Sequence, residues 1–392
     1  MFLAGVRGAC LRELAYLRSH PWDLAMVSWF PALVLLATWA IFAAGVVVKL
    51  PIALVDEDHS PGSRRVALAI DATRSSLIAA RPATLEEAWP LLRQRKVYAV
   101  VDIPPDWERR SRRADRLPVV LYTNEQFHAA GSSIGPDVGT AVASVATEGA
   151  LDDLAHLGGG FSGAKHRAEA VRVELRTLYG PQLSFERALG GTFLPAILHL
   201  FVLGGAAYAI GREFRDGGAR EWLDSANGSI AAALLGKLLP LGLAFGLMGL
   251  AIVGGFAGYR GWDVNGSIAL WSFSLLTLLA ACCAVAAMFV GLTGTLRIAL
   301  AMSAILNVTA VSFAGLSYPL VSMATPAKVW ASVLPFKYYF DLQQQQWHIG
   351  SPAAYSMFPL CILWGVFILA PLAVALPKLR ALCLNPAAWG RR

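Results

Sequence analysis

Apolar and polar positions along this chain are grouped in long blocks. Six stretches contain no Asp, Glu, Lys or Arg, and each is long enough for a helix that crosses a bilayer, which needs about 20 apolar residues. These stretches are Leu24–Val48, Ala188–Gly211, Leu238–Tyr259, Val264–Leu296, Ile298–Ala327 and Ile349–Pro377. A polar block from Lys49 to Arg187 follows the first stretch. The pattern predicts a polytopic α-helical membrane protein with six transmembrane helices, the first within residues 21–48 and the other five within 188–392.

The polar block has the pattern of a small folded domain. Four apolar runs predict strands: residues 51–55, 76–80, 97–101 and 117–122. Thr84 and Glu87 form a capping box that predicts the start of a helix between two of these strands. From Gly139 to Tyr179 the pattern becomes helical and predicts the return of the chain to the membrane. Strands that alternate with helices predict an α/β domain over residues 49–187.

Residues 1–20 predict an amphipathic helix that lies in the membrane interface. One stripe at helical spacing holds the apolar side chains of Leu3, Val6, Cys10, Leu14 and Leu17. A loosely ordered tail is the alternative. His20-Pro21 ends this helix before the first span.

The distribution of Lys and Arg predicts the orientation in the membrane. With the N-terminus in the cytoplasm and six crossings, the cytoplasmic segments hold 12 Lys and Arg residues and the short outer segments hold 3. This bias predicts that both termini are cytoplasmic and that the α/β domain is extracytoplasmic. The α/β domain is balanced, with 18 basic and 18 acidic residues, so the net charge of +7 belongs to the membrane part. That charge favours anionic membrane lipid over nucleic acid as a partner.

The chain carries little that suggests catalysis or metal binding. None of the five cysteines lies in the α/β domain, and no metal-ligand spacing is present in the sequence. Gly131–Gly135 fits the G-x-S-x-G pattern, with His128 nearby. A nucleophile elbow requires a strand that runs directly into this turn, but about eight residues separate it from the predicted strand. We therefore expect a flexible exposed loop there, no metal and no directly bound cofactor.

The connection after the second apolar stretch, residues 212–228, carries the richest charge pattern. Its sequence is Arg212-Glu213-Phe214-Arg215-Asp216-Gly217-Gly218-Ala219-Arg220-Glu221-Trp222-Leu223, and Gly236-Lys237-Leu238-Leu239-Pro240 follows. A solvated loop whose arginines only fix the topology is one interpretation. A short helix that docks on a cytoplasmic partner is the other, because aromatic and Arg side chains carry much of the energy of protein interfaces.

The order of these motifs resembles that of the ABC-2 type transporter permeases, the membrane subunits of ATP-driven exporters. In that family the loop after the second span reads R-E-x-E-x-G-T-x-E-x-L, and G-K-x-x-P follows. The matching residues are Glu213, Gly217, Gly236, Lys237 and Pro240, and Glu221 and Leu223 lie one position beyond the last Glu and the Leu of the pattern. Residues 315–323 resemble the stretch between spans five and six, and the polar block resembles the subclass with a large extracytoplasmic domain, at residues 54–58 and 101–106.

The resemblance implies that residues 212–228 couple the spans to an ATPase. The implied coupling residues are Glu213, Arg215, Asp216, Gly217, Glu221 and Lys237. For Lys237, a role as a topology anchor at the end of a span is the alternative. Arg215 replaces an acidic residue of the family pattern and Gly218 replaces Thr, which leaves partner choice and the strength of coupling open.

The resemblance also implies the partners. The sequence lacks the G-x-x-x-x-G-K-[ST] motif, so ATP and Mg²⁺ are expected in a separate ABC ATPase dimer. A second permease protomer is implied, as a homodimer or heterodimer, and some members also use a periplasmic adaptor. We expect export of drug-like or lipid-like molecules across a bacterial inner membrane. A membrane sensor or scaffold that signals through its cytoplasmic loop without transport is the alternative, and a membrane enzyme ranks last.

Polar and Pro-rich positions within the apolar stretches give further candidates. His199 and Asn307 could mark a substrate pathway; a hydrogen bond between helices is the favoured alternative. Residues 319–348 predict short helices at the outer face, some of which dip into the membrane. In this stretch we expect an outer gate that involves Pro319, Met323 and Pro335.

Overall fold

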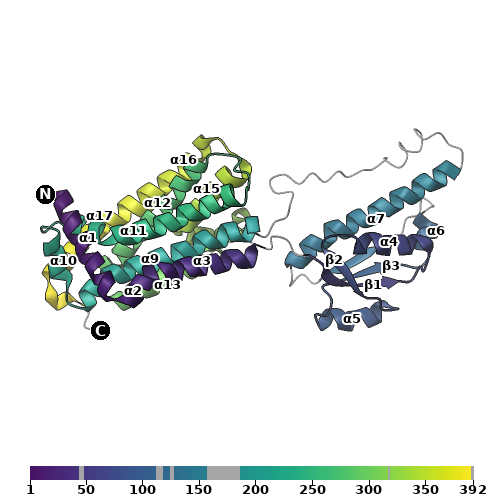
Figure 1. Ribbon diagram of the computed structural model, residues 1–392, viewed down its shortest axis with the longest axis horizontal. Helices are drawn as coiled ribbons and strands as arrows, with labels where there is room; N and C mark the ends of the chain where they lie inside the picture. The colour runs from purple at the N-terminus through teal and green to yellow at the C-terminus, as the bar shows by residue number, and fades with distance from the viewer. Residues whose placement is uncertain (44–47, 112–117, 124–127, 157–185, 317, 390–392) are drawn as a thin grey trace. The chain divides into compact units, whose positions relative to one another are not determined.

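The computed structural model describes residues 1–43, 48–111, 118–123, 128–156, 186–316 and 318–389. These residues belong to two compact units (Figure 1). The helical unit comprises Met1–Ala43 and Glu186–Arg392, and the sheet unit comprises Ala44–Phe185. The division falls within a few residues of the two ends of the polar block.

The helical unit is built almost entirely from helices. Its α-helices are α1 (Phe2–Ser19), α2 (Pro21–Val27), α3 (Trp29–Phe42), α9 (Gly191–Arg215), α10 (Ala219–Ser225), α11 (Ile230–Gly254), α12 (Ile268–Thr293), α13 (Leu296–Ala310), α14 (Thr325–Ser332), α15 (Pro335–Gln343), α16 (Ala353–Ile362) and α17 (Ala370–Leu384). Its π-helical segments are η2 (Glu186–Gly190), η3 (Gly255–Tyr259), η5 (Gln344–Ile349) and η6 (Leu363–Leu369), and its 3-10 turns are η4 (Leu320–Ser322) and η7 (Pro386–Ala388).

Among the described residues, five helices are long and apolar enough to cross a membrane. They are Pro21–Phe42, Gly191–Arg215, Ile230–Tyr259, Ile268–Thr293 and Ala353–Leu384. The prediction of a multi-pass helical membrane protein is therefore confirmed. The side of the membrane on which each end lies stays a prediction.

The predicted fifth span, Ile298–Ala327, is not one continuous helix. Helix α13 has 15 residues, which span about 22 Å, whereas the hydrocarbon core of a bilayer is about 30 Å thick. Beyond it, Gly315 has φ of 94°, a conformation that favours glycine, and Pro319 precedes the turn η4. The helix ends at Ala310, and these two residues keep the chain from resuming it, so a sixth full-length span stays a prediction. Short helices follow over residues 319–348, as predicted: η4, α14, α15 and η5.

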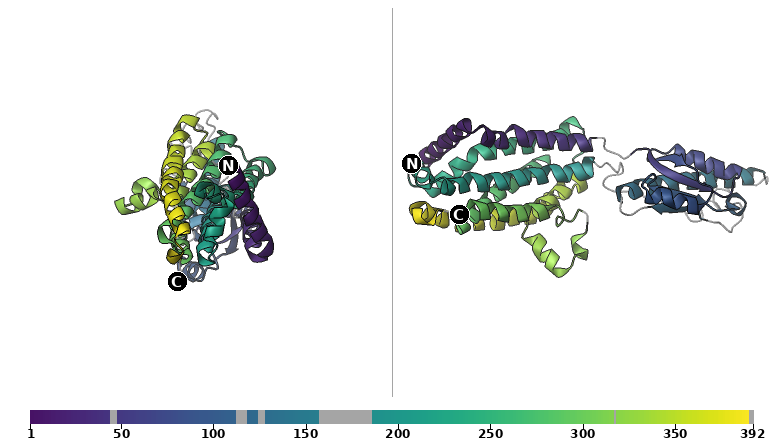
Figure 2. Two further views of the ribbon diagram at one scale, coloured as in Figure 1. Left: turned by 90° about the vertical axis from the view of Figure 1, so that its left-hand side faces the viewer. Right: turned by 90° about the horizontal axis from the view of Figure 1, so that it is seen from below.

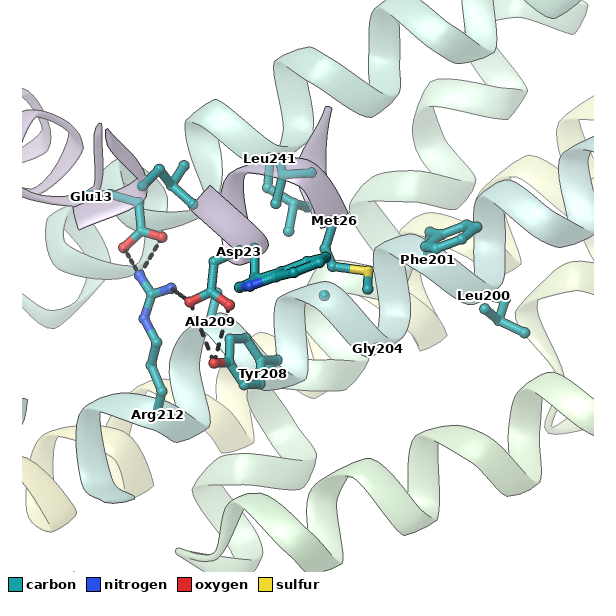
Figure 3. A pocket seen from close by; sticks show the side chains of 14 residues that line it. Glu13, Asp23, Met26, Leu200, Phe201, Gly204, Tyr208, Ala209, Arg212 and Leu241 are labelled. Carbon is teal, nitrogen blue, oxygen red and sulfur yellow. Dashed lines mark hydrogen bonds and ion pairs between the residues drawn. The ribbon is translucent and has the colours of Figure 1, made fainter. Parts of the chain in front are cut away.

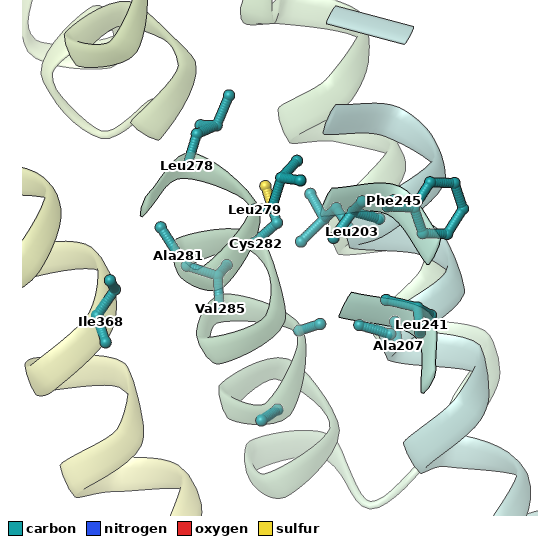
Figure 4. Close-up of a cluster of buried hydrophobic side chains, with 14 of the residues drawn as sticks. Leu203, Ala207, Leu241, Phe245, Leu278, Leu279, Ala281, Cys282, Val285 and Ile368 are labelled. Carbon is teal, nitrogen blue, oxygen red and sulfur yellow. The ribbon is translucent and has the colours of Figure 1, made fainter. Parts of the chain in front are cut away.

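Helix α12 forms the centre of the helical unit. It packs against α9, α11, α13, α15 and α17, and its alanines let these neighbours approach closely, because helix packing in membranes relies on small residues. Figure 4 shows the core around α12, with side chains of α9 and α11 on one side of this helix and Ile368 of η6 on the other. The labelled residues are Leu203, Ala207, Leu241, Phe245, Leu278, Leu279, Ala281, Cys282, Val285 and Ile368.

Helix α1 ends before Pro21 as predicted, but it packs through a different face. Its buried residues are Gly5, Ala9, Glu13 and Leu17, whereas Leu3 of the predicted stripe is 80% exposed. The buried face is lined by small residues because α1 lies directly against α11. A Cβ atom on Gly236 of α11 would lie 2.4 Å from the carbonyl oxygen of Val6. The leucines on the outer face remain free for contact with lipid.

The chain termini lie together at one end of the helical unit. Figures 1 and 2 show the N-terminus and the last turn of α17 at the same end of the unit, and α10 contacts both α1 and α17 there. The chain connects to the sheet unit at the opposite end of the bundle, through Ala43 and Glu186. There Arg260 donates hydrogen bonds to the carbonyl oxygen of Ala43 and to the carboxylate of Glu186.

The sheet unit contains a four-stranded mixed sheet. Its strands are β1 (Leu50–Asp56), β2 (Ser76–Ala80), β3 (Ala99–Ile103) and β4 (Val120–Thr123), in the order β2-β1-β3-β4. Strand β1 is parallel to β2 and β3, and β4 is antiparallel to β3. The helices are α4 (Pro61–Asp71), α5 (Leu85–Arg93), α6 (Trp107–Ser111) and α7 (His128–His156). An α/β fold is therefore present in this unit.

Alternate residues of β1 enter two separate cores. Ile52 and Leu54 pack with α4 and α7, and Ala53 and Val55 pack with α5. A strand that is buried on both faces is apolar throughout, which explains the continuous apolar run in this segment.

One expectation for the sheet unit, a flexible loop at Gly131–Gly135, differs from the structure. Gly131–Gly135 lies inside α7 rather than in a flexible loop, so that expectation was wrong, and the strand-turn-helix arrangement of a nucleophile elbow is not formed by these residues. Arg109 is exposed on α6. The rest of the helical return after His156 lies outside the described residues.

Candidate functional site

Four charged side chains are buried together at the end of the helical unit that holds α10. They are Glu13 of α1, Arg212 and Glu213 of α9, and Lys237 of α11, and none is more than 5% exposed. Removal of an ion from water costs several kcal/mol unless the ion is well paired. The partners of these four residues therefore decide whether the arrangement is stable.

The buried charges are paired across three helices. Lys237 Nζ donates to Glu13 Oε2 at 2.8 Å and to Glu213 Oε1 at 2.5 Å. Arg212 Nη2 donates to both carboxylate oxygens of Glu13 at 2.5 Å. Arg12, which is partly exposed, binds Glu213 through two parallel hydrogen bonds of 2.8 and 2.9 Å. We call these five residues the charge network.

Asp23 of α2 balances the charge of the network. The network contains three cations and two carboxylates, and Asp23 Oδ2 lies 3.8 Å from Arg212 Nη1. Its carboxylate also accepts hydrogen bonds from the hydroxyl groups of Tyr16, at 2.9 Å, and Tyr208, at 3.3 Å. The Arg212 guanidinium lies 3.5 Å from the centre of the Tyr16 ring. Figure 3 shows Arg212 between the carboxylates of Glu13 and Asp23.

The surroundings fix the protonation of the groups that α1 contributes. Burial opposes the charged form of Arg12, but its hydrogen bonds to Glu213 outweigh that effect and raise the pKa of the guanidinium. Burial and the hydrogen bond to Asp23 raise the pKa of the Tyr16 phenol. Arg12 therefore stays charged and Tyr16 stays a hydrogen-bond donor at neutral pH.

Local sequence explains how the network forms. Gly236 allows α1 to lie against α11, which places the neighbouring Lys237 directly beside Glu13. Arg212 and Glu213 lie in the last turn of α9, and the chain turns away from that helix at Gly217, which has φ of 78°. The last turn of α9 therefore meets α1 and α11 at one point.

Helix α10 covers this end of the unit as an amphipathic element. Trp222 is buried, and its indole Nε1 donates to the carbonyl oxygen of Ala233 at 3.1 Å. Phe214 packs edge-on against the same ring. The opposite face of α10 is charged and exposed and comprises Arg220, Glu221 and Asp224; Arg215 and Asp216, at the end of α9, are exposed next to it in the chain. The α10 segment is thus anchored in the bundle and presents a charged surface outward.

The sequence model of one protein family, described as ABC-2 family transporter protein, matches residues 21–376 of this chain. This chain belongs to the ABC-2 transporter family. Membership makes it a permease, the membrane component of an ABC transporter, and the family in general works with an ABC ATPase. A comparison with curated proteins finds no match. The resemblance inferred from the sequence motifs is confirmed.

The residues expected to couple the permease to an ATPase fall into two groups. Glu213 and Lys237 are buried in the charge network. Arg215, Asp216 and Gly217 are exposed, and the Glu221 side chain is 83% exposed. The hydrogen bond from Arg215 lowers the pKa of the Asp216 carboxyl, which keeps it ionised. The structure therefore separates residues that hold the α10 segment in place from residues that face outward.

The structure explains why Gly218 stands where the family pattern has Thr. A Cβ atom at this position would lie 2.8 Å from Glu213 Oε2 and 3.0 Å from Arg12 Nη2. The ion pair between α1 and α9 occupies the space that a Thr side chain needs. The departure at Gly218 is thus linked to the pairing of Arg12 with Glu213.

Sequence reasoning missed the contributions of α1 and α2 to this site. Glu13 shares a four-residue spacing with Gly5, Ala9 and Leu17, which places a carboxylate on the small-residue face of a helix. That spacing was the available signal. Nothing local marked Asp23 as the third carboxylate.

The two predicted pathway residues lie on helices that pack together, α9 and α13. His199 is buried and its ring interacts with the side chain of Asn307, although neither ring nitrogen has a hydrogen bond of good geometry to a described residue. Its ring packs against Phe336 of α15, with 5.7 Å between the ring centres. Asn307 is partly buried, and its Oδ1 is also without a hydrogen-bond partner in the described part of the chain. The pathway role stays a prediction.

The three residues of the expected outer gate are spread along the connection between α13 and α15. Pro319 is exposed and Met323 is partly buried, whereas Pro335 is buried in the first turn of α15. A gate formed by these residues stays a prediction.

Proposed function

We propose that this permease exports drug-like or lipid-like compounds from the cytoplasm or the inner membrane. A separate ABC ATPase dimer, which binds ATP and Mg²⁺, supplies the energy from the α10 side. Two permease protomers form the transport path between them. In this orientation both chain termini are cytoplasmic, and the sheet unit is periplasmic, where it offers a docking site for an adaptor protein.

One observation supports this proposal above the others, namely the attachment of α10 to the charge network. The exposed face of α10 offers charged groups to a cytoplasmic partner, while Trp222 fixes the helix to the bundle. A displacement of α10 is transmitted to α9 by the short Gly217-Gly218 connection, and from α9 to α1 and α11 by the buried ion pairs of Arg212 and Glu213. Coupled motion requires stiff contacts with two arrangements that nucleotide binding biases. The network supplies the stiffness.

Reversal of the charge on the outward face of α10 tests the proposed coupling. We expect Glu221→Lys to reduce ATP-dependent substrate accumulation in inside-out vesicles at least tenfold when the ATPase is co-expressed. The substituted side chain faces solvent, and its 4.0 Å contact with Arg12 is too exposed to contribute much stability. The protein should therefore insert and fold normally, with an unchanged melting temperature.

A matched control separates coupling from a general effect of charge. Glu57→Lys makes the same reversal at an exposed site of the sheet unit and should leave transport unchanged. Full transport by Glu221→Lys rejects the coupling role of this face. An output that persists without the ATPase and without accumulation supports the sensor or scaffold instead.

A further inference from the structure

An open cavity of about 380 Å³ lies between α2 and the spans α9 and α11, next to the charge network (Figure 3). One half is apolar and includes Met26 and Leu200, whose side chains are also exposed on the surface of the spans. The other half ends at Asp23, Tyr208 and Arg212. The cavity therefore joins a surface suited to lipid tails with a buried polar end.

The polar end continues toward the end of the bundle that holds α10. A second cavity of about 330 Å³ shares Trp22, Asp23 and Tyr208 with the first and extends to His20 and Asp216. The two cavities form an amphipathic path with an apolar wall on one side and ionisable groups on the other. This shape fits a molecule with an apolar body and one polar group.

The hydrogen bonds already formed at the polar end indicate the charge of that group. Arg212 is engaged with Glu13 and the Tyr16 ring, and its Nε atom, which has no hydrogen-bond partner among the described residues, is buried from solvent. Asp23, in contrast, is 20% exposed and accepts hydrogen bonds only from Tyr16 and Tyr208 among the described residues. A carboxylate has about four acceptor sites. The Asp23 carboxylate can therefore accept a further hydrogen bond, which a ligand with a hydrogen-bond donor would supply.

We propose that this cavity binds a cationic amphiphile, with a protonated amine at Asp23 and an apolar body along Met26, Leu200 and Phe201. The rings of Trp22 and Tyr208 lie at the same end of the cavity and favour a cation, because aromatic faces attract positive charge. An anionic head group is disfavoured by Asp23, the carboxylate that lines both cavities. The site deepens the proposed function, and its role as the entry point for exported substrates rests on that function.

Photolabelling of the full-length permease in lipid vesicles tests the site without ATP or ATPase. The probes are three octadecyl chains that carry the same diazirine in the tail and differ only in the head group, which is an amine, an alcohol or a carboxylic acid. Peptide mass spectrometry then locates the labels. We expect the amine probe to label the segments around Met26 and Leu200 at least tenfold more than the acid probe. Equal labelling by the two charged probes overturns the proposal.

Two variants locate the effect within the cavity. Asp23→Asn should lower labelling by the amine to the level of the alcohol and leave the alcohol unchanged. Gly204→Leu should block all three probes, because a Cβ at Gly204 meets no atom within 4 Å and the side chain can fill the cavity. The control Gly242→Leu is equally open but lies on α11 away from the cavity, and it should label normally. Labelling by the amine that survives both cavity variants overturns the site.

The binding assay also separates this inference from the proposed function. Selective labelling by the amine in a permease that does not accumulate substrate supports the site and contradicts export. ATP-dependent transport of the amine that Gly204→Leu leaves intact, with no labelling of the cavity, contradicts the site and supports export.

Discussion

Lys237→Met is expected to lower the free energy of unfolding of the helical unit by about 3–5 kcal/mol, because removal of one partner leaves buried charge uncompensated. Lys237 is 1% exposed and donates to both Glu13 and Glu213. Without its ammonium group, the three carboxylates of the site, including Asp23, face only two arginines. Met has a similar length and fills most of the same space, so the loss comes mainly from electrostatics rather than from a cavity.

The melting temperature of the purified permease measures this effect. All five cysteines are free, and Cys282 and Cys383 are buried, so a dye that fluoresces on reaction with thiols reports unfolding directly. A fall of about 10 °C corresponds to the lower end of the expected range. Adding Glu13→Gln to Lys237→Met restores the charge balance and should recover part of the loss. A melting temperature equal to that of the wild type in the single variant would show that Lys237 is not needed to neutralise the carboxylates.

The sequence predicted the sheet unit well because its signals are local. The capping residue Thr84 accepts a hydrogen bond from the backbone N–H of Glu87, as the capping box requires, and β2 occupies the predicted residues Ser76–Ala80. Strand β1 was visible as an apolar run because it is buried on both faces. Each of these features depends on residues only a few positions apart.

The helical unit was harder to predict because lipid and protein are both apolar. The leucine stripe of α1 identified an apolar face, but the bilayer solvates leucine, and the contact with α11 is made by Gly5 and Ala9 instead. In a membrane the small residues, rather than the large apolar ones, mark where helices touch. The length of an apolar stretch was equally misleading for α13, whose helix ends at Ala310.

The candidate site was only half visible in the sequence. The family motif identified Glu213 and Lys237, but their partners in α1 lie about 200 positions away, and no local spacing reports such a pairing. The resemblance also implied a coupling role for Glu213 and Glu221 alike. The structure shows that these residues differ in burial: Glu213 is buried and forms an ion pair with Arg12, whereas Glu221 faces outward.

Gly236→Val is expected to separate α1 from α11 and to abolish the charge network. A Cβ at Gly236 would lie 2.4 Å from the carbonyl oxygen of Val6 and 3.0 Å from the backbone nitrogen of Cys10. These are backbone atoms, which cannot rotate away as a side chain can, so the helices must move apart. Glu13 would then leave both Arg212 and Lys237, and the cost of unpaired buried charge adds to the loss of packing.

The thiol of Cys10 reports this separation, because it lies on α1 and is partly covered in the native structure. We expect maleimide labelling of Cys10 in Gly236→Val to rise at least fivefold, with a larger fall in melting temperature than in Lys237→Met. Gly242→Val introduces the same β-branched side chain into α11 where a Cβ meets no atom within 4 Å, so it controls for helix propensity. If both glycine variants label and melt alike, α1 is not held by close contact at Gly236. If only Gly236→Val fails, one residue without a side chain determines whether α1 can complete the network, and the ion pairs that join α1, α9 and α11 depend on it.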